Sequence, residues 1–156
     1  MLINNTININ GRAAALAKIK GSKDYPEING TVQFYRQKGG VLVYAEVWGL
    51  LKESSFYGFH IHEGTLCDGN NDDPFALALT HYNPLDRPHP YHAGDLPPLL
   101  SSGGHAISVF LTNRFTLSEV LGKVIIIHSS PDDFTTQPSG NSGEKIACGV
   151  IISTKK

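Results

Sequence analysis

The sequence predicts an all-β fold, a small barrel or sandwich of short strands, and three observations point to it. Sixteen glycines and nine prolines divide the chain into short runs that are rich in β-branched and aromatic residues. Residues 41–47 alternate, so that Val41, Val43, Ala45 and Val47 share one face of an extended strand. No segment has the length and the helical period of a long helix.

The same patterns place the other strands. Gly39 and Gly40 indicate a hairpin turn between a strand at 31–37 and the strand at 41–47. Further strands are expected at 13–20, 56–62, 106–111, 123–128 and 146–153, which makes about seven or eight in all.

Two long segments, residues 64–98 and 129–144, are polar and rich in glycine or proline, and we expect them to be loops. Loops of this length are usually functional, because a contact, a bridge or a metal must offset the entropy lost when they become ordered. We expect the chain, 1–156, to form one domain, with residues 1–11 as a loose polar lead-in.

The charge balance argues against two classes of partner. Lys and Arg number 13 and Asp and Glu 14, a net charge of -1, so we predict neither a nucleic-acid nor a membrane partner. No run approaches the roughly 20 apolar residues that span a bilayer. Residues 1–5 lack the character of a secretory leader, which leaves two localisations open: cytoplasmic as written, or extracytoplasmic after removal of a leader.

The cysteine count also leaves two interpretations open. Cys67 and Cys148 could form one disulfide, or they could be two buried thiols. The seven histidines are more informative, because five of them fall between His60 and His92.

The first histidine pair lies in a predicted strand. Alternation puts His60 and His62 on one face of that strand, and Phe59 and Ile61 on the other face, toward the core. A histidine pair of this kind is by itself weak support for metal binding, since surface strands also carry paired polar residues.

The second group is stronger. His81 precedes His89, His92 and Asp95, which follow at three-residue spacing in the proline-rich loop. Three imidazoles and a carboxylate from one loop match the four tetrahedral ligands that zinc prefers. His128 ends an apolar run at the start of the second loop, and alone it would be interpreted as a buried structural histidine.

Together these residues resemble a known family. The sequences GFHIHE (58–63), HYNP (81–84), HAGDL (92–96) and ACGVI (147–151), with His128 between the last two, closely resemble the copper/zinc superoxide dismutases. The resemblance extends from about residue 12 to residue 152, and EGTLC (63–67) and DFTTQP (133–138) resemble the bacterial branch.

The resemblance implies an eight-stranded antiparallel Greek-key β-barrel or sandwich, immunoglobulin-like, with two long functional loops. It also implies copper and zinc as cofactors, a disulfide between Cys67 and Cys148, and Asp132 as an acceptor for His60 and His89. The implied ligands are His60, His62, His81 and His128 for copper, and His81, His89, His92 and Asp95 for zinc.

The activity that the resemblance implies is conversion of superoxide to dioxygen and hydrogen peroxide by Cu(II)/Cu(I) cycling. His81 would bridge the metals and carry a proton. A cationic side chain near copper would attract the anionic substrate. Family members have arginine two residues before ACGVI, but this chain has Lys145, which should make docking looser and the enzyme slower.

The sequence departs from the family in one further place. Only Pro90 and Tyr91 separate His89 from His92, which is shorter than in familiar members and puts zinc affinity in question. His105 matches no ligand position, so we expect it to be structural or exposed. The resemblance also implies a homodimer, but it does not indicate which surface forms the interface.

Two rival functions remain. The chain could be a non-catalytic copper/zinc-binding protein that stores or delivers metal on the same fold, or a zinc-stabilised module that uses the proline-rich loop as a contact surface. Both predict metal binding without superoxide turnover.

Overall fold

The structure is a computed structural model, and it describes residues 11–51 and 54–155. In this part of the chain, nine strands form one sheet in the order β4-β6-β7-β3-β2-β1-β9-β8-β5, and every pairing is antiparallel. The strands are β1 (Ala15–Gly21), β2 (Asn29–Gln37), β3 (Gly40–Trp48), β4 (Ser55–Tyr57), β5 (Phe59–His62), β6 (Leu99–Ser102), β7 (His105–Thr112), β8 (Val124–His128) and β9 (Lys145–Ser153). Two short helical turns are η1 (Ala76–Ala78) and α1 (Leu117–Val120). The predicted lead-in lies outside the described residues, apart from Gly11.

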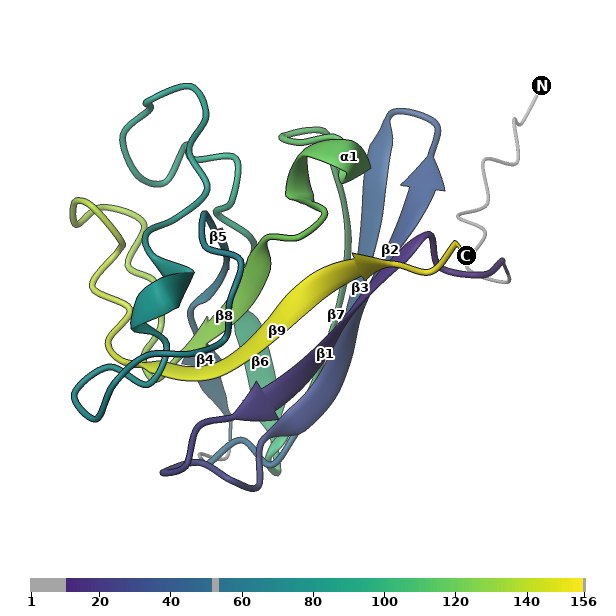
Figure 1. Ribbon diagram of the computed structural model, residues 1–156. Helices are drawn as coiled ribbons and strands as arrows, with labels where there is room; N and C mark the ends of the chain where they lie inside the picture. The colour runs from purple at the N-terminus through teal and green to yellow at the C-terminus, as the bar shows by residue number, and fades with distance from the viewer. Residues whose placement is uncertain (1–10, 52–53, 156) are drawn as a thin grey trace.

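The sheet closes on itself. Its first and last strands, β4 and β5, follow each other in the chain with only Gly58 between them. The sheet therefore curves round until its edges meet, which makes a nearly closed barrel (Figure 1). Several connections, such as the one from β3 to β4, pass over neighbouring strands, as in a Greek key. The predicted all-β, antiparallel fold is confirmed.

The described residues form nine strands rather than the predicted eight. One reason is that residues 56–62 do not form one strand. Phe56 pairs with β6, whereas Phe59 pairs with β8. The chain changes partner at Gly58, where an added Cβ would lie 2.8 Å from the side chain of Ser142. The strand β6 was not expected, because only four residues, LLSS, separate two prolines from two glycines there.

The core lies inside the barrel. Val41, Val43, Ala45 and Val47 are at most 3 % exposed and belong to one apolar cluster with residues from β1, β2, β5, β8 and β9, which confirms the predicted alternation. On β5, Phe59 and Ile61 join this cluster. The intervening histidines therefore point away from the core, toward the loops.

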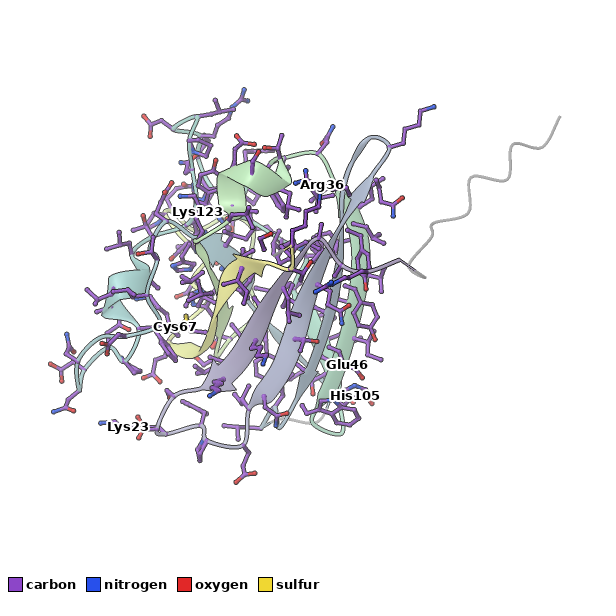
Figure 2. The ribbon with its side chains drawn as sticks, turned by 45° about the vertical axis from the view of Figure 1, so that its right-hand side comes forward. Lys23, Arg36, Glu46, Cys67, His105 and Lys123 are labelled. Carbon is purple, nitrogen blue, oxygen red and sulfur yellow. A yellow bond between two sulfur atoms is a disulfide. The ribbon has the colours of Figure 1, made fainter. Side chains whose placement is uncertain are left out.

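Both long loops are present, one between β5 and β6 and the other between β8 and β9. They lie together at one side of the barrel (Figure 1). A disulfide between Cys67 and Cys148 joins the first loop to β9, with a Cα–Cα distance of 5.6 Å (Figure 2). The disulfide interpretation is thus confirmed, and cross-linking residues 81 apart in sequence stabilises the fold by about 4–5 kcal/mol in the chain-entropy model. No helix in the described part of the chain has the length and apolarity needed to cross a membrane.

Candidate metal centre

The predicted ligands gather into two buried groups beside β5. Each group offers four ligand atoms that lie within 4.8 Å of one another. The first group is His60, His62, His81 and His128, and the second is His81, His89, His92 and Asp95. His81 belongs to both, so the two groups share one side chain.

The edge of β5 that does not pair with β8 brings the two groups together. One edge of this strand pairs with β8, and the first long loop hydrogen-bonds to the other. The N–H of Ile61 donates to the carbonyl of Gly94 at 2.9 Å, and the N–H of Tyr82 donates to the carbonyl of Ile61 at 2.8 Å. These bonds place His81 and Asp95 beside the histidines of β5. Glycine is required at 94, since a Cβ there would lie 2.2 Å from the carbonyl oxygen of Ile61.

Backbone carbonyls orient two histidines of the first group. Nδ1 of His62 lies 2.9 Å from the carbonyl oxygen of Leu79, and Nδ1 of His128 lies 3.3 Å from that of Gly143. A carbonyl only accepts, so each Nδ1 carries the proton and each Nε2 is free to bind a ligand. The two Nε2 atoms are 3.3 Å apart and face each other.

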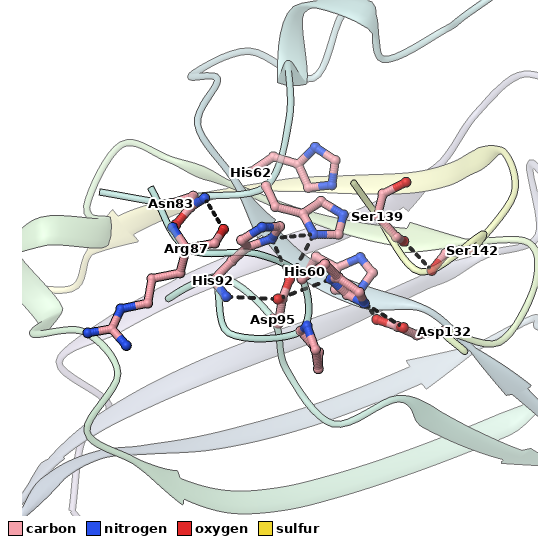
Figure 3. Close-up of polar contacts among 12 residues, drawn as sticks. His60, His62, Asn83, Arg87, His92, Asp95, Asp132, Ser139 and Ser142 are labelled. Carbon is pink, nitrogen blue, oxygen red and sulfur yellow. Dashed lines mark hydrogen bonds and ion pairs between the residues drawn. The ribbon is translucent and has the colours of Figure 1, made fainter. Parts of the chain in front are cut away.

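Asp132 orients one histidine in each group. Its carboxylate accepts from Nε2 of His60 at 2.7 Å and from Nε2 of His89 at 2.8 Å (Figure 3). Burial alone would raise the pKa of Asp132, but the hydrogen bonds from His60, from the N–H of Phe134 and from His89 lower it to about 2. Because Nε2 carries the proton in both rings, the unprotonated Nδ1 of His60 is directed into the first group and that of His89 into the second. A Cβ added at Gly140 would lie 2.0 Å from Oδ1 of Asp132, so only glycine allows the backbone at residue 140 to lie this close to the carboxylate.

The second group is centred on the carboxylate of Asp95. Its oxygens lie 2.7 Å from Nδ1 of His81, 3.1 Å from Nδ1 of His89 and 3.2 Å from Nδ1 of His92. The Nδ1 atoms of His81 and His92 are 3.3 Å apart. Three ring nitrogens and one carboxylate oxygen thus converge on a single point, although only two residues separate His89 from His92.

Three of these ring nitrogens are buried without a hydrogen-bond partner: Nδ1 of His60, Nε2 of His81 and Nδ1 of His89. A buried polar atom without a partner is unfavourable by about 1–3 kcal/mol, so three in one place indicate ligand atoms for ions. Burial also lowers the pKa of His60 to about 4 and that of His128 to about 3, which keeps their rings neutral. Neutral imidazole is the form that binds a metal, and the residues present therefore fit two metal ions.

Comparison with known proteins identifies the family. The family model for "Copper/zinc superoxide dismutase (SODC)" matches residues 28–151. The chain belongs to this family. It is 36 % identical over 143 residues to a superoxide dismutase [Cu-Zn] from Deinococcus radiodurans, covering 80 % of this chain and 78 % of the relative.

Solved structures share the fold. A Cu/Zn superoxide dismutase from Brucella abortus superposes with a TM-score of 0.75 at 25 % identity, covering 87 % of this chain and 98 % of that one. A double mutant of a superoxide dismutase-like protein from Bacillus subtilis gives 0.75 at 27 % identity, covering 90 % and 100 %. The proteins that this chain resembles therefore include ones named superoxide dismutases and one described only as similar to them.

Within the superoxide dismutase fold of this chain, a pocket of about 410 Å³ opens at the first group, and His62, His128 and Lys145 are among its lining residues. Lys145, which the family resemblance places at an arginine position, donates from Nζ to Oδ2 of Asp73, and to the carbonyl of Phe75 at 3.3 Å. Sequence reasoning missed Asp73, which lies 72 residues away from Lys145 in sequence and has no motif that would have identified it.

Sequence reasoning also missed two side chains that hold the second group. Nη1 of Arg114 donates to the carbonyls of Pro90, His92 and Asp95 at 3.0, 3.3 and 3.2 Å. The side-chain amide of Gln137 pairs with the backbone of His89: its Oε1 accepts from the N–H at 2.9 Å, and its Nε2 donates to the carbonyl at 2.7 Å. Neither residue is close in sequence to the ligands.

The seventh histidine lies outside both groups. His105 stacks on Trp48 with ring centroids 3.4 Å apart, and its Nε2 lies 3.1 Å from Oε1 of Glu46 (Figure 2). His105 is partly exposed and has structural partners, in keeping with the expectation that it is structural or exposed.

Proposed function

We propose that this protein is a superoxide dismutase that works with one copper and one zinc ion bridged by His81. Family membership and the relatives named superoxide dismutase [Cu-Zn] support the activity in general. The observation that carries the finer proposal is the position of the His81 ring. Its Nδ1 lies 2.7 Å from Asp95 in the second group, while its Nε2 is buried without a partner in the first.

The two donor sets suit different metals. Four imidazoles, from His60, His62, His81 and His128, form a nitrogen-rich set of the kind that copper accepts in both oxidation states. Three imidazoles and the carboxylate of Asp95, with His81, His89 and His92, suit tetrahedral zinc, which does no redox chemistry. Asp132 would keep both sets oriented through His60 and His89.

The first group would hold copper, which would supply one-electron redox chemistry for the overall conversion of two superoxide ions and two protons to dioxygen and hydrogen peroxide. The residues of the chain contribute the proton handling. Nε2 of His81 can hold one proton and hand it to the departing peroxide, because Nδ1 keeps the ring anchored to the second group. The other proton would come from water in the pocket that His62, His128 and Lys145 line.

Lys145 would help the substrate to reach the site. Superoxide is a small anion, and a cation at the rim of a pocket raises the local concentration of such a ligand. The ammonium of Lys145 is sheltered, with a side chain only 17 % exposed, so water screens its charge less than that of a free surface lysine.

The test is reconstitution of the metal-free protein with copper alone, zinc alone and both, followed by a superoxide-consumption assay on each form. We expect one equivalent of each metal and fast turnover when both are bound. Decay of superoxide at the rate of buffer alone, with copper bound in full, would contradict the proposal.

The rival function is copper and zinc binding without turnover. It is favoured by the Bacillus subtilis relative described only as superoxide dismutase-like, and by the ion pair that occupies Lys145. The same reconstitution decides between the two, since this rival predicts full metal content with no turnover. The homodimer stays a prediction, which sedimentation of the metal-loaded protein tests.

A further inference from the structure

Lys145 lies between two recesses of the surface. It lines the pocket at the first metal group together with His62 and His128. It also lines a second cavity of about 410 Å³, whose wall carries Asp72, Asp73 and other acidic residues. The positive charge of Lys145 therefore faces both recesses: the pocket that is proposed to take an anion, and the second cavity, which is lined by acidic residues.

Asp73 binds the ammonium in a fixed position. Its Oδ2 accepts from Nζ of Lys145, and its Oδ1 accepts from the N–H of Phe75 at 3.0 Å. The carbonyl of Phe75 then accepts a second bond from Nζ at 3.3 Å. A lysine has three N–H donors, so two of them are used here and one is left for a ligand in the pocket.

We propose that Asp73 is a positioning residue for anion entry: it holds the ammonium of Lys145 at the rim of the metal-site pocket and offsets its charge. The pocket then attracts small anions more weakly than a lysine without this partner would. The inference rests on the proposed function for its substrate, superoxide, but the geometry that carries it does not depend on turnover.

The electrostatic reason is simple. A carboxylate in contact with an ammonium makes a pair with little net charge, and the pair's field falls off faster with distance than that of a single cation. Because the aliphatic stem of Lys145 is flexible, its contacts with residues 73–75 also determine the position of the ammonium group. The residue that sets anion attraction at this site is therefore Asp73 as much as Lys145.

The test uses azide, a small monovalent anion that binds Cu(II), titrated optically against the full-length protein loaded with copper and zinc. The variant is Asp73→Asn, which removes the charge and keeps an oxygen for the N–H of Phe75. The matched control is Asp72→Asn, an exposed neighbour in the same recess with the same charge change. At low salt we expect Asp73→Asn to tighten azide binding roughly three- to tenfold, and the control to change it by less than about twofold. The difference should shrink at high salt.

A second pair of variants removes Lys145. In a Lys145→Met background, Asp73→Asn should behave like the control, because the carboxylate acts through the ammonium. An equal effect of Asp73→Asn and Asp72→Asn, or a full effect that persists without Lys145, would overturn the inference. If the wild type consumes no superoxide but the azide pattern holds, the proposed function fails and the role of Asp73 stands.

A metal-free readout checks the contact itself. Nitrogen-15 NMR of lysine side chains detects an ammonium whose protons exchange slowly because it is held in an ion pair. We expect one such signal from Lys145 in the metal-free wild type and in Asp72→Asn, and its loss in Asp73→Asn. An unchanged signal in Asp73→Asn would show that Asp73 does not hold this ammonium.

Discussion

Oδ1 of Asp132 lies 2.8 Å from Nε2 of His89, a member of the second donor group. The other oxygen of the same carboxylate takes Nε2 of His60 in the first group. One side chain from the second long loop thus sets the ring orientation of a ligand for each proposed metal, and the two sites are mechanically coupled even apart from His81.

Replacing Asp132 with Asn should therefore weaken both sites. The amide can accept one of the two bonds but presents an N–H to the other ring, so one imidazole loses its orientation. We expect metal affinity to fall about 10- to 100-fold, measured by competition with chelators of known affinity. The exposed Asp86→Asn serves as control. Unchanged affinity for both metals in Asp132→Asn would contradict this account of the carboxylate.

His128 is a member of the first group only, so His128→Ala should separate the metals. We expect copper affinity to fall and superoxide turnover to drop to the level of the metal-free protein. Zinc should stay near one equivalent, because the second group keeps all four donors. Metal content by mass spectrometry of dialysed protein checks this. Loss of zinc together with copper would contradict the assignment of His128 to the first group alone.

Arg114 should matter for zinc more than for copper. Its guanidinium donates to three backbone carbonyls of the segment that carries His92 and Asp95, and so helps to hold two donors of the second group in place. We expect Arg114→Met to lower zinc affinity roughly tenfold, by the same reasoning that applies to other groups supporting a metal ligand, and to leave copper binding nearly intact. The control, Arg87→Met, removes an exposed arginine from the same loop. Equal zinc affinity in the two variants would rule out this role.

The metal-free protein should lose stability in mild acid. Burial lowers the pKa of His60 to about 4 and of His128 to about 3, from an ordinary value of 6.5. At pH values between 6.5 and these lowered pKa values, the two histidines bind protons in the unfolded chain but not in the folded chain. The stabilisation is thus fully present above pH 6.5 and is lost as the pH falls toward 4 and below, by on the order of 1–2 kcal/mol per group at pH 5.

Urea unfolding of the metal-free protein at pH 7.5 and pH 5.0 measures this loss. Bound metals compete with protons for the same ring nitrogens, so the metal-loaded protein should lose less stability over the upper part of this range. A midpoint in urea that is the same for the metal-free protein at both pH values would contradict the assignment of neutral, buried imidazoles.

Local patterns in the chain were sufficient for much of the fold and of the site. Alternation over residues 41–47 assigned a core face, and the same rule put His60 and His62 on the side opposite Phe59 and Ile61, as the structure confirms. These inferences hold because a strand has a period of two, whatever it pairs with. The grouping of His89, His92 and Asp95 was similarly local, since short spacing in one loop keeps donors within reach of one another.

Long-range contacts decided the rest. The division of 56–62 at Gly58 depends on which strands lie on either side of it, and the docking of Gly94 on Ile61 depends on an edge that exists only in the closed sheet. The contacts of Asp73 with Lys145 and of Arg114 with the second group join residues far apart in the chain. Their side chains carry no period or spacing that local rules can use, because a single ion pair or hydrogen bond leaves no pattern in the sequence around it.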